Sequence, residues 1–197
     1  MIYSEGEYYH YFGVPLGSFN PKNGKIDSNG WRKGLPPMWY PTHSTAFYNC
    51  VSGGHMTQVS CLGMNSIVGH LKPENNSYGN PFGTEIALLR TSEGGMSRMV
   101  VSWDTPGGHG EIGRVYGQKK TDKYRNIDVR PALPPDIESG GHGGSHGQLT
   151  NNFIESILLD KEPIVNIDTA LNLTVSGVVA HMSALENGKW MDIPLFS

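Results

Sequence analysis

The order of hydrophobic periodicities along this chain limits what it can fold into more than any other feature. Segments rich in β-branched and aromatic residues come first, and segments with the spacing of amphipathic helices come last. The strand candidates in the middle of the chain span residues 56–63, 83–91, 97–103 and 112–118, and the late helix candidates span residues 145–162 and 168–187. Strands followed by helices predict an α+β fold, in which a large antiparallel or mixed β-sheet is covered by helices on one face.

Short turns between these strands predict how they pair. The turn at residues 92–95 makes the middle two strands a hairpin. Consecutive strands joined by short turns are expected to be antiparallel neighbours, because parallel neighbours need longer crossovers. The second late helix carries an apolar stripe, expected to face the core, that consists of Leu171, Val175, Val178, Met182 and Leu185.

The first quarter of the chain is less regular. Residues 1–12 are β-rich and aromatic, so the chain is expected to start inside a strand, and residues 13–41 predict a long surface excursion of a kind that is often functional. Residues 42–50 predict a short helix with Thr42 as its N-cap. The sequence has no internal repeat, and we expect a single domain over residues 1–197.

Composition and charge exclude several classes of protein. With 37% hydrophobic and 17% charged residues, the chain is too apolar for intrinsic disorder. The 15 Lys and Arg are dispersed and the net charge is −3, so no nucleic-acid partner is expected. The apolar runs are far shorter than the roughly 20 residues that cross a bilayer, so no membrane partner is expected. No export signal is visible, and the compartment stays unknown: the cytoplasm is favoured, and the periplasm remains open if a preceding segment carries such a signal.

Residues 108–113 match the letters of the dinucleotide fingerprint G-x-G-x-x-G. That fingerprint needs a helix after it, whereas Arg114, Val115 and Tyr116 continue as a strand. We interpret the match as chance, and the cofactor-binding residues of this chain remain unknown. The sequence contains no zinc or calcium motif, so no metal site is predicted.

Among the eight histidines, His43 is the strongest candidate for proton transfer. It lies where the irregular segment meets a helix N-terminus, which favours the neutral imidazole that a proton acceptor requires. Tyr40 supplies a hydroxyl in the same short segment. His181, beside the apolar stripe of the second late helix, is expected to be a hydrogen-bonded packing residue.

Two further segments could face a ligand. Tyr8 and His10 alternate on one face of the first strand, so both can point into one cavity, although a half-buried aromatic strand would show the same pattern. His142 lies in a glycine-rich run, residues 141–146, before a helix whose free N–H groups could receive a phosphate or a hydroxyl-rich ligand. Ser145 has capping-box spacing to Gln148 there, and a flexible linker is the alternative.

Four motifs, in this order, carry a resemblance to a known family: SEGEYYH at residues 4–10, YPTHS at 40–44, GHGGSH at 141–146 and TVSGVVAHMSAL at 174–185. Together they resemble the C-terminal domain of Gfo/Idh/MocA-type oxidoreductases, close to the branch that contains glycoside hydrolase family 109. The resemblance covers nearly the whole chain. It implies a substrate-binding and oligomerisation domain that is the C-terminal portion of a two-domain protein, with the Rossmann domain absent. NAD or NADP would be bound mainly by that missing N-terminal domain.

The resemblance also implies roles for individual residues. By position, His43 matches the family's acid/base histidine and Tyr40 the tyrosine of the same motif, so these two are the predicted catalytic residues. Tyr8 and His10 match strand residues that face the substrate. Trp39 stands four residues before the histidine, where many dehydrogenase members have an aspartate. The absence of that aspartate favours the glycosidase-like branch.

We therefore predict substrate contacts for Tyr8, His10, Trp39 and His142, and three functions stay open. The first is an NAD(P)-dependent oxidoreductase that acts on a sugar, inositol or related polyol. The second is an NAD-dependent glycosidase that works by transient oxidation and elimination. The third is a non-catalytic module that binds sugar or dimerises. In the first two, the chain would be inactive without its Rossmann domain, and the resemblance implies a homo-oligomer formed through the sheet.

Overall fold

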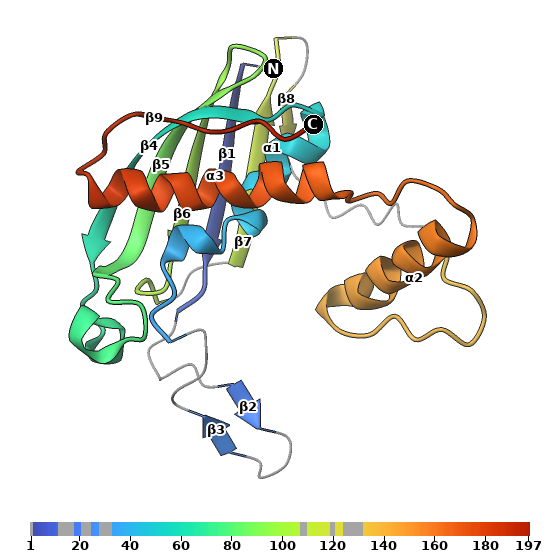
Figure 1. Ribbon diagram of the computed structural model, residues 1–197, viewed down its shortest axis with the longest axis horizontal. Coiled ribbons are helices and arrows are strands. Elements are labelled where there is room, and N and C mark those ends of the chain that lie inside the picture. The colour runs from blue at the N-terminus through green and yellow to red at the C-terminus, as the bar shows by residue number, and fades with distance from the viewer. Residues whose placement is uncertain are drawn as a thin grey trace. The chain divides into compact units, whose positions relative to one another are not determined.

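The computed structural model describes residues 2–11, 33–106, 110–118 and 132–197, together with the backbone of three short strands at 18–20, 25–27 and 121–123. The chain forms two compact units (Figure 1). The larger unit contains Met1–Tyr124 and Leu171–Ser197, and the smaller one contains Arg125–Ala170. His142 therefore belongs to the smaller unit, and the other candidate site residues belong to the larger one.

A mixed β-sheet forms the centre of the larger unit (Figure 1). The described strands lie in the order β8-β7-β1-β6-β5-β4-β9. Their bounds are β1 Tyr3–Tyr9, β4 Met56–Asn65, β5 Phe82–Thr91, β6 Met96–Ser102, β7 Gly110–Tyr116, β8 Thr121–Lys123 and β9 Met191–Asp192. Strands β2 (Ser18–Asn20) and β3 (Lys25–Asp27) pair separately with each other. The predicted α+β fold with a mixed sheet is confirmed.

The first strand lies in the middle of this sheet. It pairs in parallel with β6 and antiparallel with β7. The predicted pairing of β6 with β7 is therefore wrong, because β1 occupies the place between them. The long connection from β1 to β4 provides the crossover that a parallel pair needs, whereas the hairpin of β5 and β6 forms as predicted. As a result, Tyr8 of β1 lies directly opposite Glu111 of β7.

Helices of the larger unit pack on one face of the sheet. Alternate strand residues on that face are fully buried, and they include Val59, Ala87, Leu89, Met99 and Val101. Helix α3 (Ile167–Leu185) crosses this face, where Ala180 and Ala184 join the core (Figure 1). On the opposite face, Leu62, Ile86 and Leu88 are exposed.

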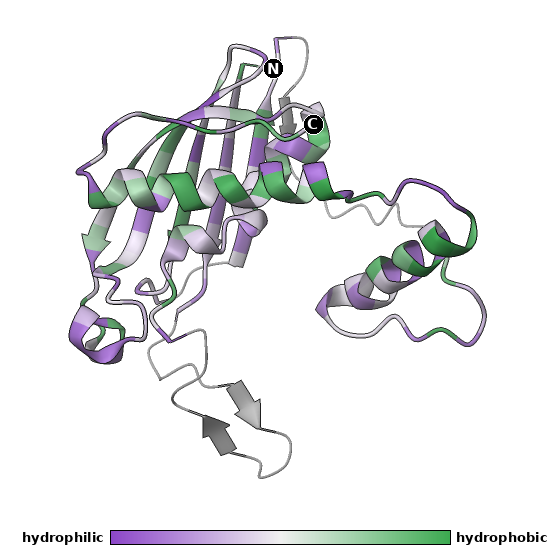
Figure 2. Cartoon of the chain, viewed as in Figure 1, coloured by the Kyte–Doolittle hydropathy of each residue, from purple (hydrophilic) through white to green (hydrophobic). Residues whose placement is uncertain are grey.

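The apolar stripe predicted for α3 meets the core only in part, because Val175 packs against the core but the last two members of the stripe do not. Met182 and Leu185 are 50% and 55% exposed, whereas the buried positions are mostly small residues such as Ser176 and Gly177. A Cβ at Gly177 would lie 2.0 Å from the carbonyl oxygen of Met38, so only glycine allows this close approach. Apolar residues lie along much of α3, and for that reason periodicity alone did not identify the buried side (Figure 2).

The smaller unit contains α2 (Ser145–Leu158), preceded by a short 3₁₀ turn, η4 (His142–Gly144). Ser145 starts the helix instead of capping it, because Gly144, with a φ of +92°, is the N-cap and no side chain caps the helix. The predicted capping box is therefore wrong. The apolar stripe of α2 is visible in Figure 2, and its members Leu149, Phe153 and Ile157 are exposed.

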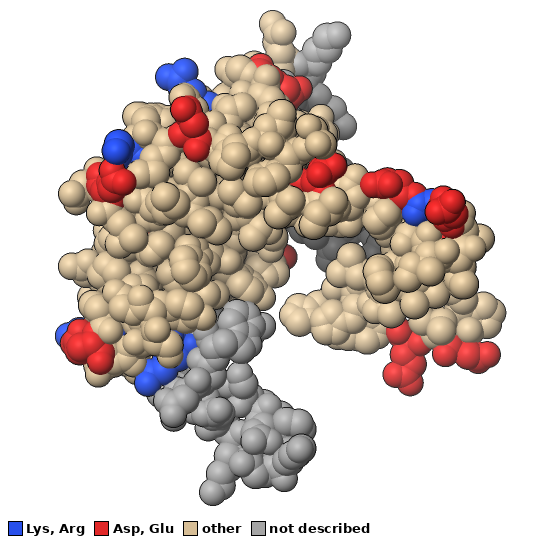
Figure 3. Space-filling model, in the orientation of Figure 1, with Lys and Arg blue, Asp and Glu red and all other residues tan. Residues whose placement is uncertain are grey.

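The surface of the chain carries few charges on the face shown in Figure 3, where Lys, Arg, Asp and Glu are scattered among uncharged side chains. Among the described helices, none has the length and apolar character to span a membrane.

Candidate functional site

Helix α1 (Thr42–Ser52) is seated on the sheet at a pair of glycines. Gly6 of β1 and Gly113 of β7 lie opposite each other. A Cβ on Gly6 would lie 2.1 Å from the carbonyl oxygen of Ser44, and a Cβ on Gly113 would lie 2.0 Å from the ring of Phe47. Any larger residue at either position would push α1 away from the sheet. The glycine pair thus places the first turn of α1, which carries His43, close to β1.

The first turn of α1 is organised by Pro41. The backbone N–H groups of Ser44 and Thr45 both donate to the Pro41 carbonyl oxygen at 2.8 Å, and their hydroxyls donate to the same oxygen. Pro41 is the N-cap residue and Thr42 is already helical, so the predicted N-cap at Thr42 is wrong by one residue. His43 is consequently the second residue of the helix, at its open end.

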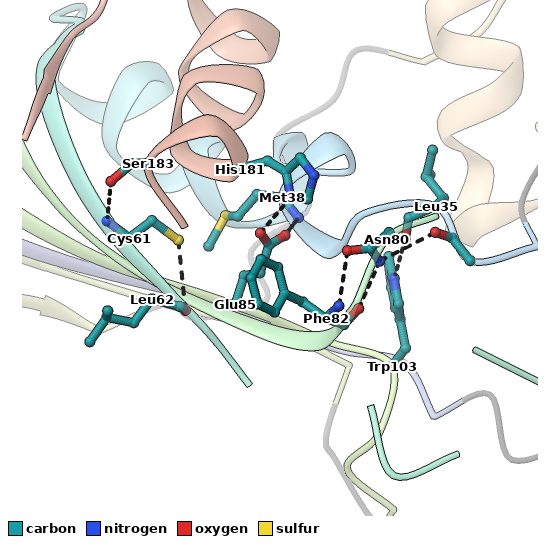
Figure 4. A network of polar contacts seen from close by, with 11 residues as sticks. Leu35, Met38, Cys61, Leu62, Asn80, Phe82, Glu85, Trp103, His181 and Ser183 are labelled. Atoms are coloured by element: carbon teal, nitrogen blue, oxygen red, sulfur yellow. Dashed lines mark hydrogen bonds and ion pairs between the residues drawn. The ribbon is translucent and has the colours of Figure 1, made fainter. Parts of the chain in front are cut away.

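The segment that leads into α1 is held by a buried polar network (Figure 4). The indole Nε1 of Trp103 donates to the carbonyl oxygen of Leu35 at 2.9 Å. The backbone N–H of Met38 donates to Oε2 of Glu85 at 2.7 Å, and Oε1 of Glu85 lies 2.7 Å from Nδ1 of His181. Glu85 is completely buried, and the predicted packing role of His181 is confirmed. These bonds fix the path of the backbone just before Tyr40 and His43.

Four predicted site residues meet in one aromatic cluster. The ring of Tyr8 stacks on the imidazole of His43, with ring centres 4.3 Å apart and planes 22° apart. Tyr40 lies 4.9 Å from the same imidazole, and His10 lies 5.8 Å from Tyr8. Trp103 also packs against the cluster, because its ring meets the ring of Tyr8 edge-on, with ring centres 5.9 Å apart. Sequence reasoning missed Trp103, for which the only signal was an aromatic residue at the end of a predicted strand.

A carboxylate completes this cluster. Oε1 of Glu111 lies 2.6 Å from Nδ1 of His43, and the two side chains are 50% and 27% exposed. A neutral imidazole whose Nδ1 faces a carboxylate oxygen carries its proton on Nδ1 and leaves Nε2 as an acceptor. Sequence reasoning also missed Glu111, because nothing in the local pattern shows that β7 lies beside β1.

A groove of about 420 Å³ opens beside this pair. It is lined by His43, Glu111 and the outer side of α1, which contributes Thr42, Ala46, Phe47, Cys50 and Val51. Partial burial raises the pKa of the Cys50 thiol, so the thiol stays protonated near neutral pH. The groups of this groove that are suited to proton transfer are therefore His43 and Glu111.

The remaining two candidates lie in other surroundings. Trp39, 39% exposed, packs its ring edge-on against Tyr78 and His181, at 5.7 Å from each. His142 lies in the smaller unit, where its Nδ1 is 2.7 Å from Nε2 of His146. Substrate contacts by Trp39 and His142 stay predictions.

The described residues group neither a metal-binding cluster nor a dinucleotide-binding turn. In the part of the chain that the structure describes, no three His, Cys, Asp or Glu side chains are grouped to hold a metal ion. Residues 110–116 form strand β7, so the glycine-rich letters that end at Gly113 do not make the turn before a helix that a pyrophosphate requires. Residues 108 and 109 lie outside the described residues.

Solved structures share this architecture. Levoglucosan dehydrogenase in complex with NADH and levoglucosan matches with a TM-score of 0.66 and 11% identity, over 99% of this chain and 59% of that one. Myo-inositol dehydrogenase from Lactobacillus casei, in complex with NAD(H) and myo-inositol, matches with a TM-score of 0.63 and 10% identity, over 100% and 55% of the two chains. A probable dehydrogenase from Thermotoga maritima matches with a TM-score of 0.64 and 13% identity, over 97% and 56%.

The chain shares its α+β fold with part of each of these dehydrogenase structures. It spans between 55% and 59% of the length of the three solved structures named above. No family model and no curated protein matches the sequence. At identities of 10–13% this likeness concerns the fold.

Proposed function

We propose that this chain is the substrate-binding part of an NAD(P)-dependent oxidoreductase that acts on a sugar, an inositol or a related polyol. The observation that carries the proposal is the position of His43, which lies at the open start of α1 beside two tyrosine rings and a carboxylate. The fold that holds this histidine is shared with dehydrogenases whose solved structures contain levoglucosan or myo-inositol.

In this proposal, His43 exchanges the proton of a substrate hydroxyl. With Nδ1 directed at Glu111, the free Nε2 accepts the proton when the hydroxyl is oxidised and returns it when a carbonyl is reduced. The rings of Tyr8 and Tyr40 offer apolar faces and hydroxyls close to the imidazole, which suits a polyol ring with both C–H and O–H groups. His10 lies at the edge of the same cluster and would contact the substrate from the sheet.

The hydride would be exchanged with a nicotinamide cofactor. The described residues offer no strand, glycine turn and helix in the order that holds a pyrophosphate, so the proposal assigns the cofactor to a Rossmann domain outside this chain. The contribution of this chain is to bind and orient the polyol and to move its hydroxyl proton.

The proposal is tested by His43→Ala in the full-length enzyme, with NAD⁺ or NADP⁺ and either myo-inositol or levoglucosan as probes. Loss of a general acid/base lowers kcat by about 10²- to 10⁴-fold, and this is the expected result. His55→Ala, which removes an imidazole at the turn before β4, is the matched control and should leave kcat unchanged. A loss below about tenfold for His43→Ala would exclude the acid/base role.

An NAD-dependent glycosidase is the second candidate. Trp39 favours it, because an indole packed against Tyr78 and His181 occupies the position where many dehydrogenase members have an aspartate. The two candidates differ in cofactor turnover. The oxidoreductase consumes NAD(P)⁺ in proportion to product, whereas the glycosidase releases sugar from an aryl glycoside with no net reduction of NAD⁺.

We also propose that the exposed face of the sheet joins two copies of the chain. Leu62, Met64, Ile86 and Leu88 on that face are 47–62% exposed and adjoin one another on neighbouring strands. Monomeric proteins rarely leave such a row of apolar side chains in water. A purely structural module would dimerise in the same way. The two possibilities differ in catalysis, because only an enzyme has an activity that His43→Ala lowers.

A further inference from the structure

We propose that Glu111 is a positioning residue, which holds His43 in the one tautomer that can accept a proton from a substrate hydroxyl. The proposal rests on the acid/base role of His43 given above. It adds a residue to the site that neither the sequence motifs nor the fold comparison assigns.

The register of the sheet brings Glu111 to His43. Glu111 pairs directly with Tyr8 across β7 and β1, so the two side chains leave the sheet side by side on the face that α1 covers. The ring of Tyr8 stacks on the flat side of the imidazole at 4.3 Å, and the carboxylate of Glu111 meets its Nδ1 edge at 2.6 Å. Tyr8 therefore fixes the tilt of the imidazole ring, and Glu111 fixes the rotation of the ring about the side-chain axis.

This contact decides which nitrogen is free. The Nδ1–H group donates to the carboxylate, and the Nε2 lone pair is left for a ligand. Free histidine prefers the opposite tautomer, with its proton on Nε2, and in that form Nε2 cannot act as a base. Glu111 therefore selects the reactive form of His43, as a carboxylate orients the histidine in other acid/base sites.

The contact has little value as a structural ion pair. The Glu111 side chain is 50% exposed and the His43 side chain 27% exposed, and exposed pairs contribute little to folding stability. The seat of α1 depends instead on Gly6 and Gly113. Replacing Glu111 should leave the fold intact, so a functional effect can be measured cleanly.

The test uses Glu111→Gln, His43→Ala and the double variant in the full-length enzyme, with NAD⁺ and myo-inositol or levoglucosan as probes. Glu111→Gln should lower kcat/KM by about 10- to 100-fold, the usual loss when the partner of a functional histidine is removed. In the His43→Ala background, the same change should alter kcat/KM less than about twofold, because residues that act through one another are not additive. Glu186→Gln removes the same charge from an exposed pair with Lys189, and as the control it should have no effect.

A second readout does not depend on activity. The ¹⁵N spectrum of the His43 imidazole should show the proton on Nδ1 in the wild type and a shift toward the Nε2–H form in Glu111→Gln. An unchanged tautomer, or an equal loss of kcat/KM in the presence and absence of the His43 side chain, would overturn the proposal. A tautomer that depends on Glu111, together with a His43→Ala variant of near-normal activity, would support the pairing and overturn the proposed function instead.

Discussion

Replacing the buried carboxylate of Glu85 should be among the most damaging single changes in the core of this protein. Its two oxygens accept from the Met38 N–H and contact Nδ1 of His181, both at 2.7 Å, and the side chain is completely buried. Glu85→Ala leaves both groups without this partner, and each buried polar group left unpaired costs about 1–3 kcal/mol. We expect the free energy of unfolding to fall by about 3–5 kcal/mol, the range seen when one partner of a buried pair is removed.

Glu85→Gln is the matched control. The amide oxygen of Gln can still accept from Met38, and its NH₂ group can donate to His181 Nδ1 when the imidazole carries its proton on Nε2. Because both contacts survive without a charge, the expected loss is about 1 kcal/mol. Gln keeps the shape of the Glu85 side chain and can satisfy both polar groups, whereas Ala satisfies neither.

Urea unfolding of the full-length protein, followed by tryptophan fluorescence, measures these losses. Trp39, Trp103 and Trp190 are the tryptophans among the described residues, and all three belong to the larger unit, so their signal reports on the sheet and not on α2. A loss below about 1 kcal/mol for Glu85→Ala would refute the reasoning, because that is the behaviour of a solvent-exposed pair. An equal loss for both variants would show that charge, and not hydrogen-bond satisfaction, governs the site.

Two further predictions concern the other face of the sheet. Leu88→Glu places a charge among exposed apolar side chains, so we expect it to halve the mass measured by sedimentation without changing the circular dichroism spectrum; a wild-type protein that is already monomeric at micromolar concentration would contradict the proposed dimer. Glu5 makes the stability depend on pH in the acid range. Burial raises the pKa of its carboxyl, but hydrogen bonds from Arg114 and Tyr3, together with the positive charges of Arg98 and Arg114, bring the net pKa below its ordinary value. A lowered pKa in the folded state stabilises the protein at neutral pH, and this contribution is lost as the pH falls through the carboxylate range. Glu5→Gln should therefore flatten the acid side of the stability curve measured by urea unfolding at several pH values, and an unchanged slope would contradict this assignment.

The sequence predicted elements well where the signal is local. Strand β5 and the hairpin with β6 follow from β-branched runs around a glycine turn, and α3 follows from a long apolar pattern. The face that each helix buries was harder to predict. The stripe with Met182 and Leu185 is more apolar than the side with Ser176 and Gly177. The small residues are nevertheless the buried ones, and Gly177 lets the helix come close to the segment that contains Met38 and Pro41.

The candidate site shows the same division. Local sequence was enough to predict His43, Tyr40, Tyr8 and His10 as site residues, because residue type and alternation are local properties. That these four residues meet, and that Trp103 and Glu111 join them, depends on the tertiary fold. The physical reason is the insertion of β1 between β6 and β7: strand order depends on which surfaces pack together across the whole sheet, and no local pattern encodes that choice.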